Sequence, residues 1–337
     1  MTGDRPKLEK SRRKRLTYMT NHHGPTVLLT DSDLGDRAED RAFLEAVLDA
    51  RVILANCRTE ADVLAAVRAD SPDAIVTQWA PITAGVIAEL DHCSVISRVG
   101  IGLDVVDLGA AAAAGIGVRN VPDYCIEEVA SHATAMLLAL ARRLPLLDAD
   151  VRAGGWDAAS GAQRTRRLST MILGLVGAGR IGRTVAAAMS GWGVEVIVCD
   201  PFADEGDFEL VSLDDLARRA DMISLHAPLT AENHHLLDAA FFARCEKSPI
   251  IVNTSRGGLI DGAALADALR SGAVSAAGLD VFEAEPLPAD DPLRSAPNCL
   301  MTPHAAWSSH AALADLRRGA VQNVVDVLRT IRQEAEQ

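Results

Sequence analysis

Hydrophobic and polar positions along the chain follow two alternating periods. From residue 26 onward, short apolar runs alternate with segments whose apolar residues recur at helical spacing. The runs predict strands at 26–30, 52–54, 74–76, 95–98 and 117–119. The segments between them predict helices at 38–49, 59–69, 83–91 and 104–114, and Thr59 with Asp62 resembles a capping box at the start of the second. This alternation predicts βαβ units and a parallel sheet.

A second series of the same kind follows a long helical stretch at 126–143 and an irregular segment around 152–156. Its predicted strands are 171–176, 194–199, 222–225, 249–253 and 276–280. An amphipathic helix at about 308–332 ends the pattern. We therefore predict an α/β chain of two Rossmann-like, doubly wound parallel-sheet domains joined near residue 121.

Length and composition agree with two globular domains. The 337 residues exceed the roughly 100–200 of one domain. A composition of 49% hydrophobic and 23% charged residues is typical of a folded chain. The net charge of −13 repels phosphate backbones, so we expect no nucleic-acid partner. No apolar run reaches the roughly 18 residues of a membrane span, so we expect no membrane partner.

Residues 1–24 are polar and basic and lack apolar periodicity, which predicts a flexible basic tail; an arm that binds nucleic acid or a membrane is the alternative. No apolar region follows the basic run 12–15, so we do not expect a secretory signal. The six cysteines lie more than thirty residues apart, which excludes CxxC clips and predicts reduced, buried thiols of a cytoplasmic protein. We expect no metal site.

One glycine-rich turn has the mechanics of a dinucleotide site. The predicted strand 171–176 leads into Gly177, Gly179 and Gly182, and a helical segment follows directly. The first glycine permits the tight turn, the second lets a pyrophosphate approach the backbone, and the third lets the helix pack on the strand. Asp200 stands 18 residues after the last glycine, where a carboxylate meets the ribose hydroxyls and repels a 2′-phosphate. We therefore predict NAD rather than NADP.

Three polar side chains follow the later strands, where α/β folds place their chemistry. Arg256 follows the predicted strand 249–253, and Glu285 and His304 lie beyond the predicted strand 276–280. Together they suit the reduction of a 2-oxo acid. Arginine grips a carboxylate and polarises the adjacent carbonyl, histidine carries the proton, and a neighbouring carboxylate orients the imidazole and favours its charged form.

These motifs resemble those of the D-isomer-specific 2-hydroxyacid dehydrogenases. The resemblance extends over about residues 26–330 and is dense in six segments in the family's order: 97–104, 177–182, 225–230, 252–261, 278–286 and 302–307. The segments 233–236 and 303–307 are most similar to the branch of the C-terminal-binding proteins, whose members include a vertebrate transcriptional corepressor.

The resemblance implies a role for each matching residue. Arg256 would bind the substrate, His304 would be the acid and base, and Glu285 would be the partner of the histidine. The backbone of Val99, Gly100 and Ile101 would receive the substrate carboxylate. The implied cofactor-binding residues are Gly177, Gly179, Arg180, Ile181, Gly182, Asp200, His226, Ala227, Pro228, Thr254, Arg256 and Asp280, the last through the nicotinamide amide.

The resemblance also implies a layout. A substrate-binding domain would comprise residues 25–120 and 305–337, and a dinucleotide-binding domain residues 121–304, with the active site in the cleft between them. A homodimer would form on the dinucleotide domains, with residues around 126–160 reaching across. Because the chain ends soon after the last predicted helix, we expect no amino-acid-binding regulatory domain of the kind some phosphoglycerate-oxidising relatives carry.

One position departs from the family pattern. Where many members have an acidic residue followed by a threonine, this chain reads Ser131-His132-Ala133. The threonine hydroxyl that contacts the cofactor is therefore absent or displaced to Thr134.

The favoured function is an NAD-dependent oxidoreductase that interconverts a small 2-oxo acid and its D-2-hydroxy acid. An NADH-sensing, corepressor-like binding protein is the alternative, and a reductase of a non-carboxylate substrate such as phosphite stays open. Glu285 disfavours formate, because the formate-oxidising members lack it. Trp79 and Trp307, expected in the cleft, favour an apolar or aromatic substrate side chain; simple packing of Trp79 on the neighbouring helix is the alternative.

Overall fold

The computed structural model describes residues 24–335 except 32, 160, 161, 163, 164, 205 and 207, so the predicted tail lies outside the described residues but for Gly24. The chain divides into two compact units, the first comprising Met1–Tyr124 and Ser309–Gln337 and the second Cys125–Ser308. Each unit is built on a parallel sheet. The predicted fold class is therefore confirmed.

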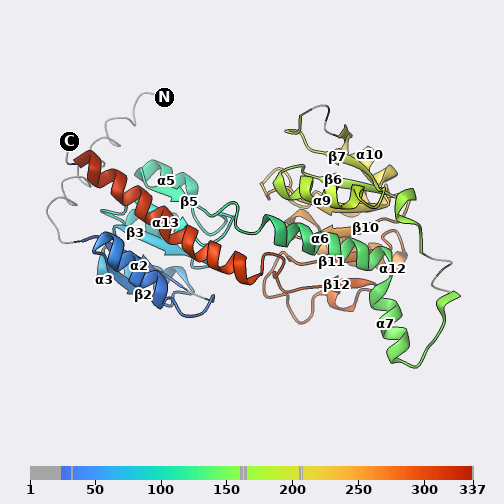
Figure 1. Ribbon diagram of the computed structural model, residues 1–337, viewed down its shortest axis with the longest axis horizontal. Helices are drawn as coiled ribbons and strands as arrows, with labels where there is room; N and C mark the ends of the chain where they lie inside the picture. Colours follow the sequence, from blue (N-terminus) through green and yellow to red (C-terminus); the bar gives the residue numbers. More distant parts are fainter. Residues whose placement is uncertain are drawn as a thin grey trace. The chain divides into compact units, whose positions relative to one another are not determined.

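The first unit has a five-stranded sheet in the order β2-β1-β3-β4-β5. Figure 1 draws the chain of this sheet in blue to teal. Its strands are β1 (Thr26–Leu29), β2 (Arg51–Leu54), β3 (Ala74–Thr77), β4 (Val95–Arg98) and β5 (Gly117–Arg119). Its helices are α2 (Ala38–Leu48), α3 (Glu60–Asp70), α4 (Ala84–Ala88), α5 (Leu108–Ala114) and α13 (His310–Ala335). The capping box of Thr59 and Asp62 is present at the start of α3, as predicted. The chain reverses its direction across the sheet between β1 and β3, which makes this point a place for ligands.

Helix α13 belongs to the first unit although it ends the described chain. It packs on β3, β4 and α2. Ser97 on β4 donates its hydroxyl to the carbonyl of Ala320 at 2.8 Å, which ties the helix to the sheet. A Cβ at Gly319 would lie 2.7 Å from the side chain of Val121, so only glycine lets the helix approach so closely.

The second unit has a seven-stranded parallel sheet in the order β12-β11-β10-β9-β6-β7-β8. Its strands are β6 (Ile172–Val176), β7 (Glu195–Cys199), β8 (Glu209–Leu210), β9 (Met222–Leu225), β10 (Ile250–Asn253), β11 (Ala276–Leu279) and β12 (Cys299–Met301). Its helices include α6 (Ile126–Ala141), α7 (Leu144–Arg152), α9 (Arg180–Ser190), α10 (Leu213–Arg219), α11 (Ala239–Ala243) and α12 (Gly262–Ser271), with 3₁₀ turns at Leu168–Thr170, Gly257–Leu259 and Pro292–Ser295. The reversal falls between β6 and β9.

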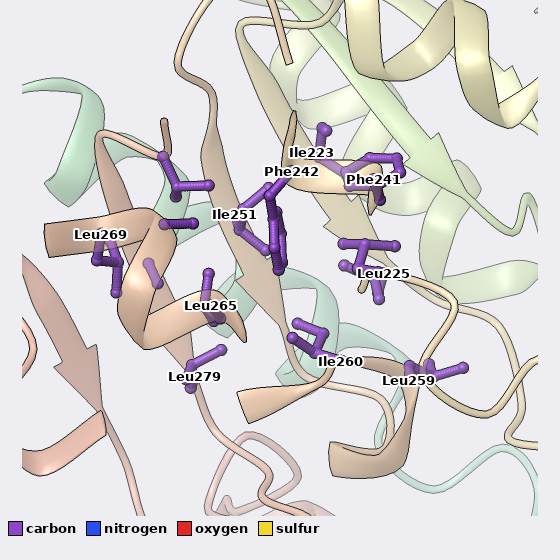
Figure 2. Packing of buried hydrophobic residues seen from close by; sticks show 14 of the residues in the cluster. Ile223, Leu225, Phe241, Phe242, Ile251, Leu259, Ile260, Leu265, Leu269 and Leu279 are labelled. Carbon is purple, nitrogen blue, oxygen red and sulfur yellow. The ribbon is translucent and has the colours of Figure 1, made fainter. Parts of the chain in front are cut away.

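The sheet of the second unit is buried on both faces. Figure 2 shows Phe242 of α11 and Leu265 of α12 beside Ile251 of β10, and Phe241 of α11 beside Ile223 of β9, all in one apolar cluster. On the opposite face, α6 packs against α9, β10 and β11. Strands buried on both sides read as continuous apolar runs, which explains why the sequence pattern locates them well.

Several boundaries differ from the prediction. The long helix ends at Ala141, because Arg143 adopts a left-handed conformation, and a separate helix, α7, begins with Pro145 in its first turn. Proline suits that position because it has no N–H to leave unpaired. The short strands β8 and β12 were not predicted, and α5 begins at Leu108 instead of 104.

The thiols also differ in part from the prediction. All six cysteines are free, but only Cys57, Cys93 and Cys125 are buried, while Cys199, Cys245 and Cys299 are partly accessible. Within the described ranges, no helix has both the length and the apolarity that a membrane span requires.

Candidate active site

The glycine turn lies at the carboxyl end of β6, beside the reversal of the second sheet. Gly177 has φ of +94°, and a Cβ there would lie 2.9 Å from the backbone of His226 and Ala227. A Cβ on Gly182 would overlap the carbonyl of Gly177, so the third glycine lets α9 start against the turn. At Gly179, the residue before α9, a Cβ would meet no protein atom within 4 Å. Open space beside the N–H groups of a helix start fits the pyrophosphate of a dinucleotide.

Asp200 follows β7 next to this turn. Its carboxylate accepts the N–H of Ala178 at 2.8 Å and the N–H of Phe202 at 2.8 Å. A carboxylate with one N–H on each oxygen retains lone pairs for further donors, such as ribose hydroxyls. The position suits the predicted role of Asp200, which stays a prediction.

Two threonine hydroxyls give an independent sign of a ligand. The Oγ1 atoms of Thr254, just after β10, and of Thr134, on α6, are buried and have no hydrogen-bond partner among the described residues. A buried polar atom without a partner is costly, so such atoms point to a bound molecule or water. Thr254 was predicted to contact the cofactor, and Thr134 is the position to which the missing family threonine could be displaced.

The structure brings Glu285 and His304 together. The Nδ1 of His304 lies 2.7 Å from Oε2 of Glu285, and the side chains are 30% and 31% exposed. The other carboxylate oxygen, Oε1, accepts the N–H of Phe282 at 2.9 Å. Nδ1 is thus the nitrogen that faces Glu285, and the proton transfer predicted for His304 would fall to Nε2.

The pKa of Glu285 reflects this arrangement. Partial burial alone raises the pKa of this carboxyl group. The hydrogen bonds from His304 and from the Phe282 N–H, with the nearby charges of His304 and Arg256, outweigh the burial and hold the pKa of Glu285 below its usual value. Glu285 is therefore an anion at neutral pH.

Arg256 stands on a rigid turn. Asn253, 1% exposed at the end of β10, donates its side-chain amide to the Arg256 carbonyl at 2.8 Å and accepts the N–H of Ser255 at 2.9 Å. A Cβ on Gly257 would overlap the backbone of Phe282. The turn that carries Arg256 is thus packed directly on the loop that carries Glu285.

Asp280 holds the segment that carries His304. It is 1% exposed, and its carboxylate accepts the N–H of Ala305 at 2.8 Å, the N–H of Ala306 at 2.9 Å and the hydroxyl of Thr302 at 2.5 Å. The His304 N–H donates to the Asp280 carbonyl at 2.8 Å, and His304 has φ of +51°. The structure thus gives Asp280 a positioning role. Its contact with a nicotinamide amide stays a prediction.

His132 takes part in the same network. Its Nε2 lies 3.1 Å from the Thr302 hydroxyl. This histidine occupies the position where the chain departs from the family pattern, and its contact with Thr302 was not predicted.

His226 lies between the glycine turn and β9. Its Nε2 is 2.9 Å from the hydroxyl of Ser224, and its N–H donates to the carbonyl of Val176 at 2.8 Å. Desolvation lowers the pKa of His226 to about 4, so its imidazole is neutral at pH 7. The two residues after it, Ala227 and Pro228, continue the loop toward Asn233, which donates its amide to the Pro228 carbonyl at 2.8 Å.

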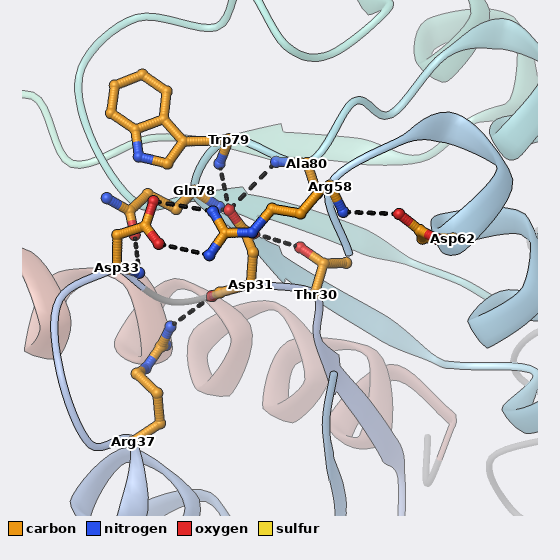
Figure 3. Close-up of polar contacts among 9 residues, drawn as sticks. All are labelled: Thr30, Asp31, Asp33, Arg37, Arg58, Asp62, Gln78, Trp79 and Ala80. Carbon is orange, nitrogen blue, oxygen red and sulfur yellow. Dashed lines mark hydrogen bonds and ion pairs between the residues drawn. The ribbon is translucent and has the colours of Figure 1, made fainter. Parts of the chain in front are cut away.

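The first unit has its own loop cluster at the reversal of its sheet. Asp31, after β1, is 1% exposed, and its carboxylate accepts the N–H groups of Gln78, Trp79 and Ala80 at 2.9, 2.6 and 3.2 Å (Figure 3). Asp31 therefore fixes the loop after β3 that presents Trp79.

Arg98 lies beside this loop. Its guanidinium carbon is 5.3 Å from the centre of the Trp79 ring, which is 42% exposed. A Cβ on Gly100, which has φ of +146°, would overlap the same guanidinium. The N–H groups of Val99 and Gly100 already donate to the carbonyls of Thr77 and Arg98, so the predicted carboxylate contact depends on Ile101. Trp307, in the second unit, is partly buried.

Three residues that shape these loops were not among the predicted site residues: Asp31, Arg98 and Asn253. Each ends or follows a predicted strand, which is the signal that identified Arg256. Applied to every strand, that signal would have found all three.

Comparison with known proteins agrees with this picture. The family profile described as "D-isomer specific 2-hydroxyacid dehydrogenase, NAD binding domain" matches residues 134–306. A D-3-phosphoglycerate dehydrogenase of Mycobacterium leprae is 42% identical over 246 residues, which cover 71% of this chain and 46% of that protein. A glyoxylate reductase of Korarchaeum cryptofilum is 36% identical over 252 residues, which cover 73% of this chain and 76% of that protein. The chain thus spans about half the length of the phosphoglycerate dehydrogenases that it matches.

Solved structures show the same fold. The TT0316 protein of Thermus thermophilus superposes with a TM-score of 0.80 at 33% identity, covering 90% of this chain and 97% of the other. A D-lactate dehydrogenase of Aquifex aeolicus, solved with NAD and lactic acid, superposes with a TM-score of 0.79 at 28% identity, covering 92% of this chain and 97% of the other.

The pKa of His226 predicts a loss of stability in acid. Between pH 6.5 and pH 4 the unfolded chain binds a proton at this imidazole that the folded chain does not, so the free energy of unfolding falls as the pH is lowered through this range. The shift corresponds to at most about 3 kcal/mol. In scanning calorimetry from pH 7.5 to 4.5, His226→Gln should lose less thermal stability on acidification than the wild type. His310→Gln, at an exposed histidine, should follow the wild type. Equal acid sensitivity of His226→Gln and the wild type would contradict the assignment.

Proposed function

Because the chain belongs to the family of D-isomer specific 2-hydroxyacid dehydrogenases, we propose that it is an NAD-dependent oxidoreductase that interconverts a small 2-oxo acid and its D-2-hydroxy acid. The observation that carries the proposal is the pair of His304 and Glu285, with Nδ1 and Oε2 2.7 Å apart, in the same unit as the glycine turn. Against its burial, the pKa of Glu285 is lowered first by the hydrogen bond from His304, then by the Phe282 N–H, and least by the charge of Arg256.

The residues divide the chemistry among them. NAD, when bound, accepts or supplies the hydride. Arg256 holds the substrate carboxylate and polarises the neighbouring carbonyl. His304 delivers its Nε2 proton to the carbonyl oxygen during reduction and takes it back during oxidation. Glu285 fixes the tautomer and orientation of the ring through Nδ1 and favours the imidazolium.

The cofactor would be held by the residues around the glycine turn. Gly177, Gly179 and Gly182, with the N–H groups of Arg180 and Ile181 at the start of α9, would hold the pyrophosphate. Asp200 would bind the ribose. The hydroxyls of Thr134 and Thr254 would gain partners from the same ligand.

The first unit would supply further groups for the substrate. We assign the N–H of Ile101 and the guanidinium of Arg98, which ends β4, to the substrate carboxylate. The Trp79 ring offers an exposed apolar face over Arg98, which suits an apolar or aromatic substrate side chain. The free cysteines agree with a reducing compartment, and we place the protein in the cytoplasm.

Turnover with a panel of 2-oxo acids tests the function and the cofactor together. The wild type should oxidise NADH with at least one 2-oxo acid of the panel and should use NADPH less well, because the Asp200 carboxylate repels a 2′-phosphate. Asp200→Ala should lower the preference for NADH, measured as kcat/KM with NADH divided by kcat/KM with NADPH. Asp204→Ala, in the following loop, is the matched control and should keep the wild-type preference. Binding of NADH without turnover of any 2-oxo acid would favour the corepressor-like alternative, and a wild-type preference for NADPH would overturn the role of Asp200.

The pH dependence of turnover tests the proton relay. Reduction needs the imidazolium of His304 and oxidation needs the neutral ring, so the two directions should have opposite pH dependence. Glu285→Gln removes the anion that favours the imidazolium, so activity should persist while the high-pH limit of reduction moves toward acid. His304→Ala should lose about 10²–10⁴-fold in kcat.

Arg256→Ala separates binding from proton transfer. It should lose turnover that no change of pH restores, because the variant keeps the acid but lacks the group that binds the substrate carboxylate.

A pH profile of Glu285→Gln that superimposes on the wild-type profile would show that the carboxylate does not act on His304. The relay would then have to be reassigned to Glu283 or Asp280.

We further propose a homodimer in which a second copy covers α7. This helix has no buried residue, and Leu144 and Val151 are 55% and 53% exposed, with Trp156 beyond it 90% exposed.

Light scattering should give the mass of a dimer at micromolar concentration. Leu144→Asp with Val151→Asp should give a monomer, because charges are costly in an apolar interface. Leu54→Asp, at a leucine of the first unit that is 45% exposed, should stay dimeric. A monomeric wild type would reject this interface.

A further inference from the structure

A group of two histidines and a glutamate lies outside the catalytic pair. His234 and His235 belong to the loop between β9 and α11, and Glu283 belongs to the loop after β11. The Nε2 of His234 lies 3.2 Å from Oε1 of Glu283, and the Nε2 of His235 lies 3.2 Å from Oε2. Each of the three residues offers one potential metal-ligand atom, and these three atoms all lie within 4.8 Å of one another. Among the described residues, they form the one such group of histidine, cysteine and acidic side chains.

The backbone builds this group. Neighbouring residues in extended chain point their side chains to opposite faces, but His235 has φ of +53° and donates its N–H to the Gly258 carbonyl at 2.8 Å. The two imidazoles therefore lie on the same side, with ring centres 3.9 Å apart and planes inclined by 29°. Asn233 closes the turn before them, accepting the Thr230 N–H at 2.7 Å.

The spacing of the ligand atoms fits a tetrahedral ion. Zinc–nitrogen and zinc–oxygen bonds of about 2.0–2.1 Å place tetrahedral ligand atoms about 3.3 Å apart. Oε1 of Glu283 lies 3.2 Å from Nε2 of His234 and 3.3 Å from Nε2 of His235, which agrees with that separation. Two imidazoles and one carboxylate form a ligand set that zinc takes in proteins, with water in the fourth position, whereas Mg²⁺ prefers oxygen ligands alone.

We infer that His234, His235 and Glu283 form a binding site for one divalent transition cation of the zinc type. The ion would take the lone pairs of the two Nε2 atoms, and any protons there would pass to solvent. The side chains are 48%, 33% and 54% exposed, so the ion exchanges freely with solution. Glu283 lies two residues before Glu285, and the His235 N–H donates to the Gly258 carbonyl in the turn after Arg256. A bound ion would therefore hold the loop that carries Glu285 to the loop that contacts the Arg256 turn.

Calorimetric titration of the untagged full chain with ZnCl₂ at pH 7 tests the site. The wild type should bind one ion per chain at this site, and MgCl₂ should not bind. His235→Asn and Glu283→Gln should each weaken zinc binding by roughly tenfold or more, because each removes one of three protein ligands. Asparagine is the matched replacement at 235, since it tolerates a positive φ without an imidazole. His234→Gln provides a second test, and the melting temperature of each variant without zinc shows that it is folded.

Two further variants locate the ion. The sequence has another adjacent pair, His22-His23, and another histidine–glutamate pair, His304 with Glu285. Binding should persist at wild-type affinity in His22→Ala with His23→Ala and in Glu285→Gln. Loss of binding in either of these variants, equal affinity in the wild type and His235→Asn, or no zinc binding by the wild type would overturn the inference. None of these measurements depends on turnover.

Discussion

The burial of one carboxylate, that of Asp280, underlies the geometry of the catalytic residues. A carboxyl group buried just after β11 is tolerated because two backbone N–H groups and the Thr302 hydroxyl donate to it. Those donors fix residues 302–306, and with them the positive φ of His304 that turns its ring toward Glu285. The first unit uses the same device, since Asp31 collects three N–H groups and thereby presents Trp79. In both units, a buried aspartate after one strand determines the shape of another loop at the same edge of the sheet.

The sequence was a good guide to the sheets for a physical reason. Strands buried on both faces need continuous apolar runs, and such runs stand out between helical segments. Short strands at the sheet edges have no such requirement: β8 has two residues, Glu209 and Leu210, both exposed, and β12 is only partly buried. The break between α6 and α7 depends on one residue in a left-handed conformation, Arg143, and no periodicity reveals that choice. The amphipathic pattern therefore predicted a single helix followed by irregular chain.

The candidate site was predictable where local spacing decides it and not where folding joins distant segments. The glycine turn is specified within six residues, and Arg256 and Asp280 follow strands directly. The approach of Glu285 to His304 needs two loops from neighbouring strands. The chemistry of the three polar residues suggested a carboxylate beside the histidine, and the family resemblance assigned it to Glu285. His132 and Thr302 are 170 positions apart in the sequence, and the packing of α6 brings them together. Glu283 and His235 are 48 positions apart, and their contact depends on the left-handed backbone of His235. Neither the side-chain types nor their order along the chain encodes those contacts.

The place of α13 has a consequence for the order of events during synthesis. Strands β1 to β5 leave the ribosome before the second unit, but the helix that covers β3 and β4 leaves after the whole of it. The second unit is contiguous and can fold as it emerges, whereas the first keeps an apolar sheet face uncovered until Ser97 meets Ala320. The nascent first unit is therefore the stage at which the chain is most exposed to aggregation and has most need of a chaperone.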